Sequence, residues 1–223
     1  MRLIILLTLL LLSALSISAT NVEVELKRGN HSQDSIRSAL VRSQKIVDKL
    51  VLADKVQQTN VLHVIANRYL ELFMIHAEYD ARNERIKALG LAEQAEKEEL
   101  ERSYYEYNSF LYRSRFGYIA WLSFYLNEEQ IETVKNEMTE NMLLLRYAAF
   151  MEMLPQLTNA EKQRVHAWLV EAREFSMDFI ARRKMQQMFT KYRGRINNYL
   201  SACGYEIGNA SAEQKARQLR EIN

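Results

Sequence analysis

The segment 191–200 (KYRGRINNYL) combines cationic, amide and phenol side chains in a pattern that suits ligand binding. On a helix, residues three, four and seven positions apart share one face. That face of the segment carries Lys191, Arg195, Asn198 and Tyr199. Such groups are typical of sites for carboxylates, phosphates or sugar hydroxyls. The competing interpretation is a solvated face whose cations form ion pairs with a neighbouring helix.

The segment just before it carries an acidic stripe formed by Glu171, Glu174 and Asp178. Three carboxylates on one side of a helix could bind a cation such as calcium or act as paired acids. A calcium-binding loop would alternate Asp or Asn with Gly, and this segment has no such pattern. A solvent-facing stripe or a set of interhelical ion pairs is the alternative.

His76 is the histidine best placed for chemistry, because it lies in an apolar stripe and Asp80 follows one helical turn later. A neighbouring carboxylate orients an imidazole and raises its pKa, which would give half of an acid–base pair. A satisfied core histidine is the alternative. The other three histidines lack metal-ligand spacing, and the chain has no Gly-rich phosphate loop or nucleophile elbow. We therefore expect no metal and no cofactor.

Aromatic residues are concentrated between Tyr104 and Tyr125, where ten of the chain's 22 lie. Large rings fill hydrophobic cores, and they also stack on sugars and peptides. Because the tyrosines in this stretch spread around the helix, some must be exposed. We expect a core with an aromatic rim, and an exposed patch would mark a binding surface.

The elements that must position these residues are helices. Pro occurs only at position 155, Gly occurs six times, and strong helix formers dominate. Apolar spacing and capping residues predict helices over about 32–52, 54–89, 92–126, 127–138, 140–154, 158–182 and 185–202. No stretch alternates with period two for long enough to predict a strand. We therefore predict an all-α, single-domain multi-helix bundle of six or seven helices.

Residues 1–19 have the order of regions found in a secretory signal peptide. A short basic start precedes an apolar run over 3–12, and small residues follow at 16, 18 and 19. The run is shorter than the roughly 20 apolar residues that span a membrane. We expect export across the inner membrane to the periplasm. The mature chain should have no membrane span and, without a Cys near the cleavage site, no lipid anchor.

The remaining chain is expected to divide into a loose N-terminal segment (20–31), a helical domain (32–208) and a frayed tail (209–223). Its single Cys203 cannot form an internal disulfide. Lys and Arg number 30 against 28 Asp and Glu, and this balance argues against a nucleic-acid partner.

Several segments together resemble an uncharacterised family of small secreted all-helical bacterial proteins. The most specific is KYRGRINNYL followed by Gly204-Tyr205, and WLVEAREFSMDF (168–179) and Ile75-His76 with Asp80 are further matches. The similarity extends over about 36–206. Two positions depart from it: Thr139-Glu140-Asn141 replaces a Thr-Tyr-Gly run, and Met185 stands where relatives tend to have His. The resemblance implies an exported helical protein that accompanies polysaccharide-degrading systems, with no established reaction.

Three functions remain open from the sequence. The first is a non-enzymatic binding or accessory protein for a glycan or an envelope partner, using the face of 191–199 with His76 and Asp80 if they lie close. The second is an enzyme acting on a glycan or an acidic sugar fragment, with His76 as acid–base group and Arg195 holding a carboxylate. The third is an envelope stress or chaperone-like protein.

Overall fold

The computed structural model describes residues 23–210, and this part of the chain is helical without strands. Its seven long helices are α1 (Gln33–Val47), α2 (Lys55–Ala88), α3 (Glu93–Ser123), α4 (Glu128–Met138), α5 (Met142–Met153), α6 (Asn159–Ser176) and α7 (Arg182–Ala202). The predicted all-α single domain with a multi-helix core is therefore confirmed. None of the described helices combines the length and apolar character needed to cross a membrane.

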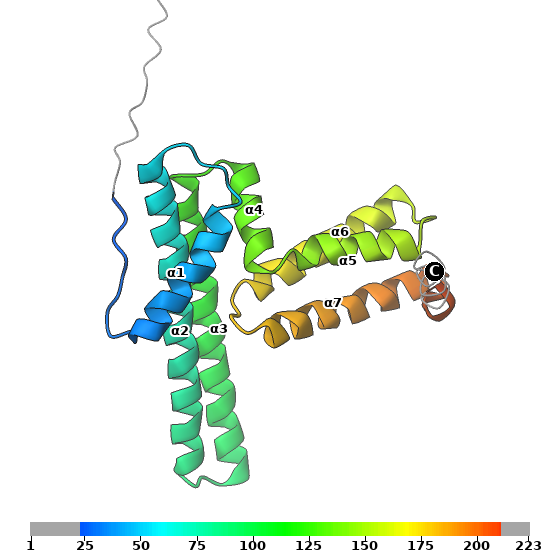
Figure 1. Cartoon of the computed structure of the whole chain (residues 1–223). Helices are drawn as coiled ribbons and strands as arrows, with labels where there is room; N and C mark the ends of the chain where they lie inside the picture. Colours follow the sequence, from blue (N-terminus) through cyan, green and yellow to red (C-terminus); the bar gives the residue numbers. More distant parts are fainter. Residues whose placement is uncertain (1–22, 211–223) are drawn as a thin grey trace, which may run out of the picture.

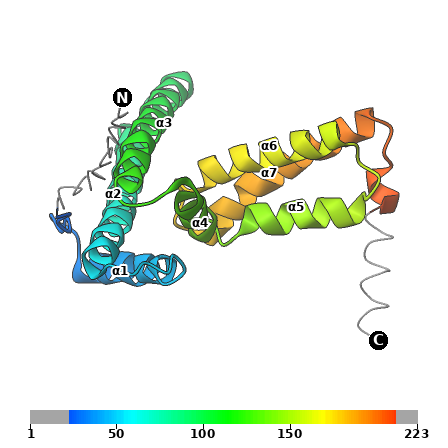
Figure 2. The same cartoon turned by 90° about the horizontal axis from the view of Figure 1, so that it is seen from above.

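The helices form two lobes that meet at an angle (Figures 1 and 2). In the N-terminal lobe, the long antiparallel pair α2 and α3 packs with α1. In the C-terminal lobe, α6 lies against both α5 and α7. Helix α4 contacts elements of both lobes. Each lobe has its own cluster of buried apolar side chains, one centred on Ile65 and Leu122 and the other on Leu169 and Phe189.

Local sequence signals set several of the helix ends. Asn127 and Gln130 form a capping box at α4, and Thr158 and Glu161 form one at α6. Gly90 follows α2 with φ +61°, a left-handed conformation that favours glycine. Asn141, where the resemblance predicts Gly, has φ 56°. Asn is among the residues that tolerate this conformation best, so the departure from the family pattern fits the backbone.

Residues 23–31, predicted to be a loose start, contain no helix but lie along α2. The amide oxygen of Asn60 accepts from the Val24 N–H, and Asn67 bonds the backbone of Glu25 and Lys27. The predicted frayed tail lies largely outside the described residues.

The predicted helix over 158–182 is wrong at its end, because α6 stops at Ser176 and a loop of five residues precedes α7. No Gly or Pro marks this stop. The loop leaves the helical path because its side chains are buried against the other lobe. Met177 is 1% exposed within the N-terminal core cluster, and Ile180 packs against the same cluster. Tertiary packing therefore overrides local helix propensity here.

Asp178 of this loop joins the lobes through a buried ion-pair cluster. Its Oδ1 is 2.7 Å from Nη2 of Arg68 on α2, and its Oδ2 pairs with Arg115 on α3. Arg68 is 2% exposed and Asp178 is 3% exposed. A second buried guanidinium, that of Arg173 on α6, bonds Glu132 on α4. Charges buried in this way must be paired, and the two lobes are therefore held in one relative position.

We expect Asp178→Asn to lower the free energy of unfolding by about 3–5 kcal/mol, because it leaves two guanidinium groups without their buried counter-charge. The control is Glu171→Gln, which removes a half-exposed partner of Arg195 and should cost less than about 1 kcal/mol. Urea denaturation at pH 7 measures both. If the two variants lose the same free energy of unfolding, the ion pairs of Asp178 do not hold the lobes together.

Candidate functional site

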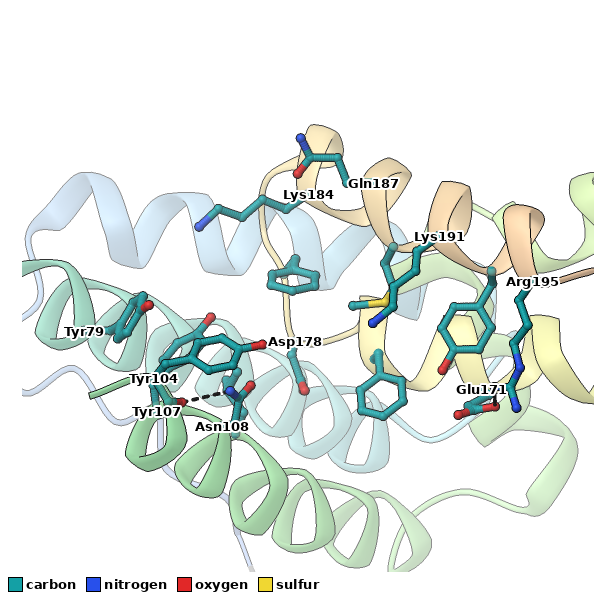
Figure 3. Close-up of a pocket in the computed structure, with 15 residues that line it drawn as sticks. Tyr79, Tyr104, Tyr107, Asn108, Glu171, Asp178, Lys184, Gln187, Lys191 and Arg195 are labelled. Carbon is teal, nitrogen blue, oxygen red and sulfur yellow. Dashed lines mark hydrogen bonds and ion pairs between the residues drawn. The ribbon is translucent and has the colours of Figure 1, made fainter. Parts of the chain in front are cut away.

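A cleft of about 770 Å³ lies where the lobes meet, with walls from α2, α3, α6, α7 and the loop between α6 and α7 (Figure 3). Six aromatic side chains line it: Tyr79, Tyr104, Tyr107, Phe175, Phe179 and Tyr192. Polar groups are contributed by Asn108 and Gln187. Pockets of this size, largely aromatic with a few convergent polar groups, are typical small-molecule sites.

Helix α7 places three cations along the cleft: Lys184, Lys191 and Arg195. Their spacing of seven and four residues keeps them on one stripe of the helix. Figure 3 shows them on the α7 side, with Lys184 at the end of the row that faces Tyr79, Tyr104 and Tyr107 and Arg195 at the other end beside Glu171. Within the described residues, neither lysine forms an ion pair.

Arg195 forms an ion pair with one neighbouring side chain and a cation–π contact with another. Its Nη1 lies 3.2 Å from Oε2 of Glu171, and its guanidinium carbon lies 4.7 Å from the ring centroid of Trp168. Both members of this ion pair remain about half exposed. The interpretation of segment 191–200 as a face paired with a neighbouring helix thus holds for Arg195 and not for Lys191.

The three carboxylates of the predicted acidic stripe do not converge on one site. Glu171 pairs with Arg195, Glu174 with Arg173 and Lys135, and Asp178 with two arginines of the other lobe. This arrangement matches the ion-pair alternative. Between residues 23 and 210, no group of three His, Cys, Asp or Glu side chains is placed to hold a metal ion.

His76 lies behind the cleft wall and bonds two residues that line it. Its Nε2 is 2.8 Å from the backbone oxygen of Asp178, and its Nδ1 is 3.0 Å from the hydroxyl oxygen of Tyr107. Asp80, the predicted partner, is exposed on α2, and the described hydrogen bonds of His76 do not include it. The predicted upward shift in pKa is also wrong, because burial lowers the pKa of His76 despite the backbone hydrogen bond.

Only part of the predicted binding face reaches the cleft. Lys191 and Arg195 line it, whereas Asn198 and Tyr199 do not. Helix α7 runs away from the N-terminal lobe toward its C-terminal end (Figure 1), so later turns have no opposite wall. Tyr199 instead packs edge-on against Trp168, with ring centroids 5.2 Å apart.

Sequence reasoning missed Lys184, Tyr79 and the position of Tyr107 in the cleft. The spacing from Lys184 to Lys191 and Arg195 was available as a signal. The predicted helices end at 182 and begin again at 185, so Lys184 falls between them, whereas α7 in fact begins at Arg182. Met185, where the resemblance predicts His, is 3% exposed in the core of the C-terminal lobe and does not line the cleft.

The lowered pKa of His76 predicts a pH-dependent stability. The unfolded state binds the proton more readily than the native state, so stability is greatest above the ordinary pKa of 6.5 and falls as the pH drops through the native pKa. We expect the free energy of unfolding of His76→Gln to fall less steeply than that of the wild type between about pH 7 and 5. The control is His166→Gln, at an exposed histidine. If the free energy of unfolding has the same pH dependence in the wild type and in His76→Gln, His76 is not the group responsible.

No curated protein matches the sequence significantly. Residues 36–219 match the family model described as protein of unknown function (DUF3826), which covers nearly all of the two-lobed structure. The chain therefore belongs to the DUF3826 family of proteins of unknown function.

Proposed function

We propose that the protein binds a carbohydrate bearing carboxylate groups in the cleft between its lobes. The observation that carries this proposal is the stripe of Lys184, Lys191 and Arg195 on α7, which lines the same cleft as a group of tyrosines on α2 and α3. Lysine and arginine recognise carboxylates through charge-assisted hydrogen bonds. Aromatic rings supply flat apolar surfaces, while their hydroxyl groups remain available to polar ligands.

The balance of charge in the cleft supports an anionic ligand. Three cations line it against two carboxylates, those of Glu171 and Asp178. Asp178 is already neutralised by Arg68 and Arg115 from behind the wall, and Glu171 is paired with Arg195. The two lysine ammonium groups therefore give the cleft a positive surplus. A bound carboxylate would compensate this surplus in a partly dehydrated site, where ion pairs are stronger than in open water.

The remaining lining favours a sugar over a phosphate or a peptide. Stacked rings of Tyr79 and Tyr107, with centroids 4.2 Å apart, give the wall a rigid aromatic surface. Asn108 and Gln187 offer amide groups to hydroxyls. The volume of about 770 Å³ suits a short oligosaccharide.

The cellular setting is part of the proposal. The predicted signal peptide over 1–19 lies outside the described residues, and it supports export to the periplasm. There the protein would act as an accessory that captures acidic oligosaccharides released from a polysaccharide.

We expect Lys191→Ala to weaken binding of acidic oligosaccharides by roughly 10-fold or more, since a charge-assisted contact is lost. Isothermal titration calorimetry with oligosaccharides from polygalacturonate, alginate and chondroitin measures the affinity, with dextran oligosaccharides as the neutral comparison. Arg193→Ala is the matched control, because Arg193 is an exposed cation of α7 that does not line the cleft. Absence of binding by the wild type, or equal weakening by both variants, would overturn the proposal.

A further inference from the structure

Tyr107 and His76 form a hydrogen bond, and the backbone oxygen of Asp178 determines which of the two residues is the donor. The backbone oxygen of Asp178 can only accept, so Nε2 of His76 carries the proton and donates it over 2.8 Å. Nδ1 then has a free electron pair and accepts from the hydroxyl of Tyr107, 3.0 Å away. A base aimed at a hydroxyl and oriented by a third group is the arrangement that activates side chains in acid–base and nucleophilic catalysis.

The two members occupy different positions relative to the cleft. Tyr107 lines it, and His76 does not. Stacking against Tyr79 fixes the ring of Tyr107, while Phe179 stacks on the imidazole with centroids 6.3 Å apart. Tyr107 is 9% exposed and lines the cleft, so the imidazole could act on a ligand only through this residue.

The surroundings of the pair keep the shared proton on Tyr107 in the resting state. Asp80 on the same helix, Asp178 of the loop and Lys184 of α7 face His76, and Tyr79 and Tyr104 face Tyr107. Burial lowers the pKa of His76, which keeps its imidazole neutral and able to accept a proton at neutral pH. Burial and the charge of Asp178 raise the pKa of Tyr107 above its ordinary value of 10, so its anion is costly to form and is a strong base once formed.

We propose that Tyr107, assisted by His76, cleaves a uronic-acid-containing glycan in this cleft by β-elimination. The inference rests on the proposed function, because the cations of α7 must hold and neutralise the substrate carboxylate. Tyr107 passes its hydroxyl proton to Nδ1 of His76 and takes the C5 proton of the uronate. The electron pair of the C5–H bond forms a C4–C5 double bond, and the C4–O bond breaks. The departing oxygen takes the proton from Tyr107, and His76 returns its own, so the pair is restored and no water is consumed.

Hydrolysis fits this site less well. It ordinarily needs two carboxyl groups across the scissile bond, one of them protonated. The two carboxylates lining the cleft, Glu171 and Asp178, are each held by guanidinium groups. Elimination needs a proton-transfer group, cations for the uronate carboxylate and a leaving group in the substrate itself, and the cleft supplies the first two.

The test uses the full mature chain with polygalacturonate, alginate, chondroitin sulfate and hyaluronan. The unsaturated product has a double bond conjugated to its carboxylate, and the rise in ultraviolet absorbance measures it. We expect elimination by the wild type and a loss of at least about 100-fold in kcat for Tyr107→Phe, with substrate affinity retained. Tyr112→Phe is the matched control and should keep its activity, because Tyr112 lies on the same helix, is exposed and does not line the cleft.

His76 is a positioning residue, and its test needs a different measurement. We expect His76→Gln to lower kcat with little change in KM and to alter the acid limb of the pH–rate profile. An unaltered profile would overturn the role of His76.

The outcomes separate the two proposals. Calorimetric binding of a polyuronate by the wild type without any unsaturated product would overturn the elimination and leave the binding function standing. Absence of binding to every polymer would overturn both. Full activity of Tyr107→Phe would overturn the assignment of Tyr107.

Discussion

The relative position of the two lobes depends on one buried interaction, the carboxylate of Asp178 between the guanidinium groups of Arg68 and Arg115. Burying a carboxylate or a guanidinium alone is costly, so each member is stable in place only while the others are present. The apolar side chains of Met177 and Ile180 bury the same loop against the N-terminal core. Packing supplies the favourable energy of this contact, and the charges restrict it to one geometry.

The same loop connects the fold to the candidate site. The side chain of Asp178 holds the lobes, and its backbone oxygen fixes the tautomer of His76. The next residue, Phe179, stacks on that imidazole and also lines the cleft. A change in the lobe contact would therefore move the Tyr107–His76 pair and the opposite wall of α7 together.

The two lobes contribute different kinds of side chain to the cleft. The N-terminal lobe contributes the stacked rings of Tyr79 and Tyr107, and α7 contributes long cationic side chains exposed at the surface. Rigid aromatic groups lose little conformational entropy when a ligand binds, while lysines adapt to a carboxylate. This division suits recognition of a chain of sugar rings with charges along one edge.

The sequence by itself determined the all-helical class, the capping boxes at α4 and α6, the end of α2 at Gly90 and the cationic character of the helix around Lys191. These features depend on residues within one or two helical turns of each other, so spacing and residue type suffice to predict them.

Only the tertiary structure decided that α6 ends at Ser176, that Asp178 pairs across the lobes and that His76 bonds Tyr107 in place of Asp80. The partners concerned, Arg68 and Asp178, are separated by 110 positions in the chain. Their meeting depends on how whole helices pack, and burial then reversed the pKa shift that the local sequence predicted for His76.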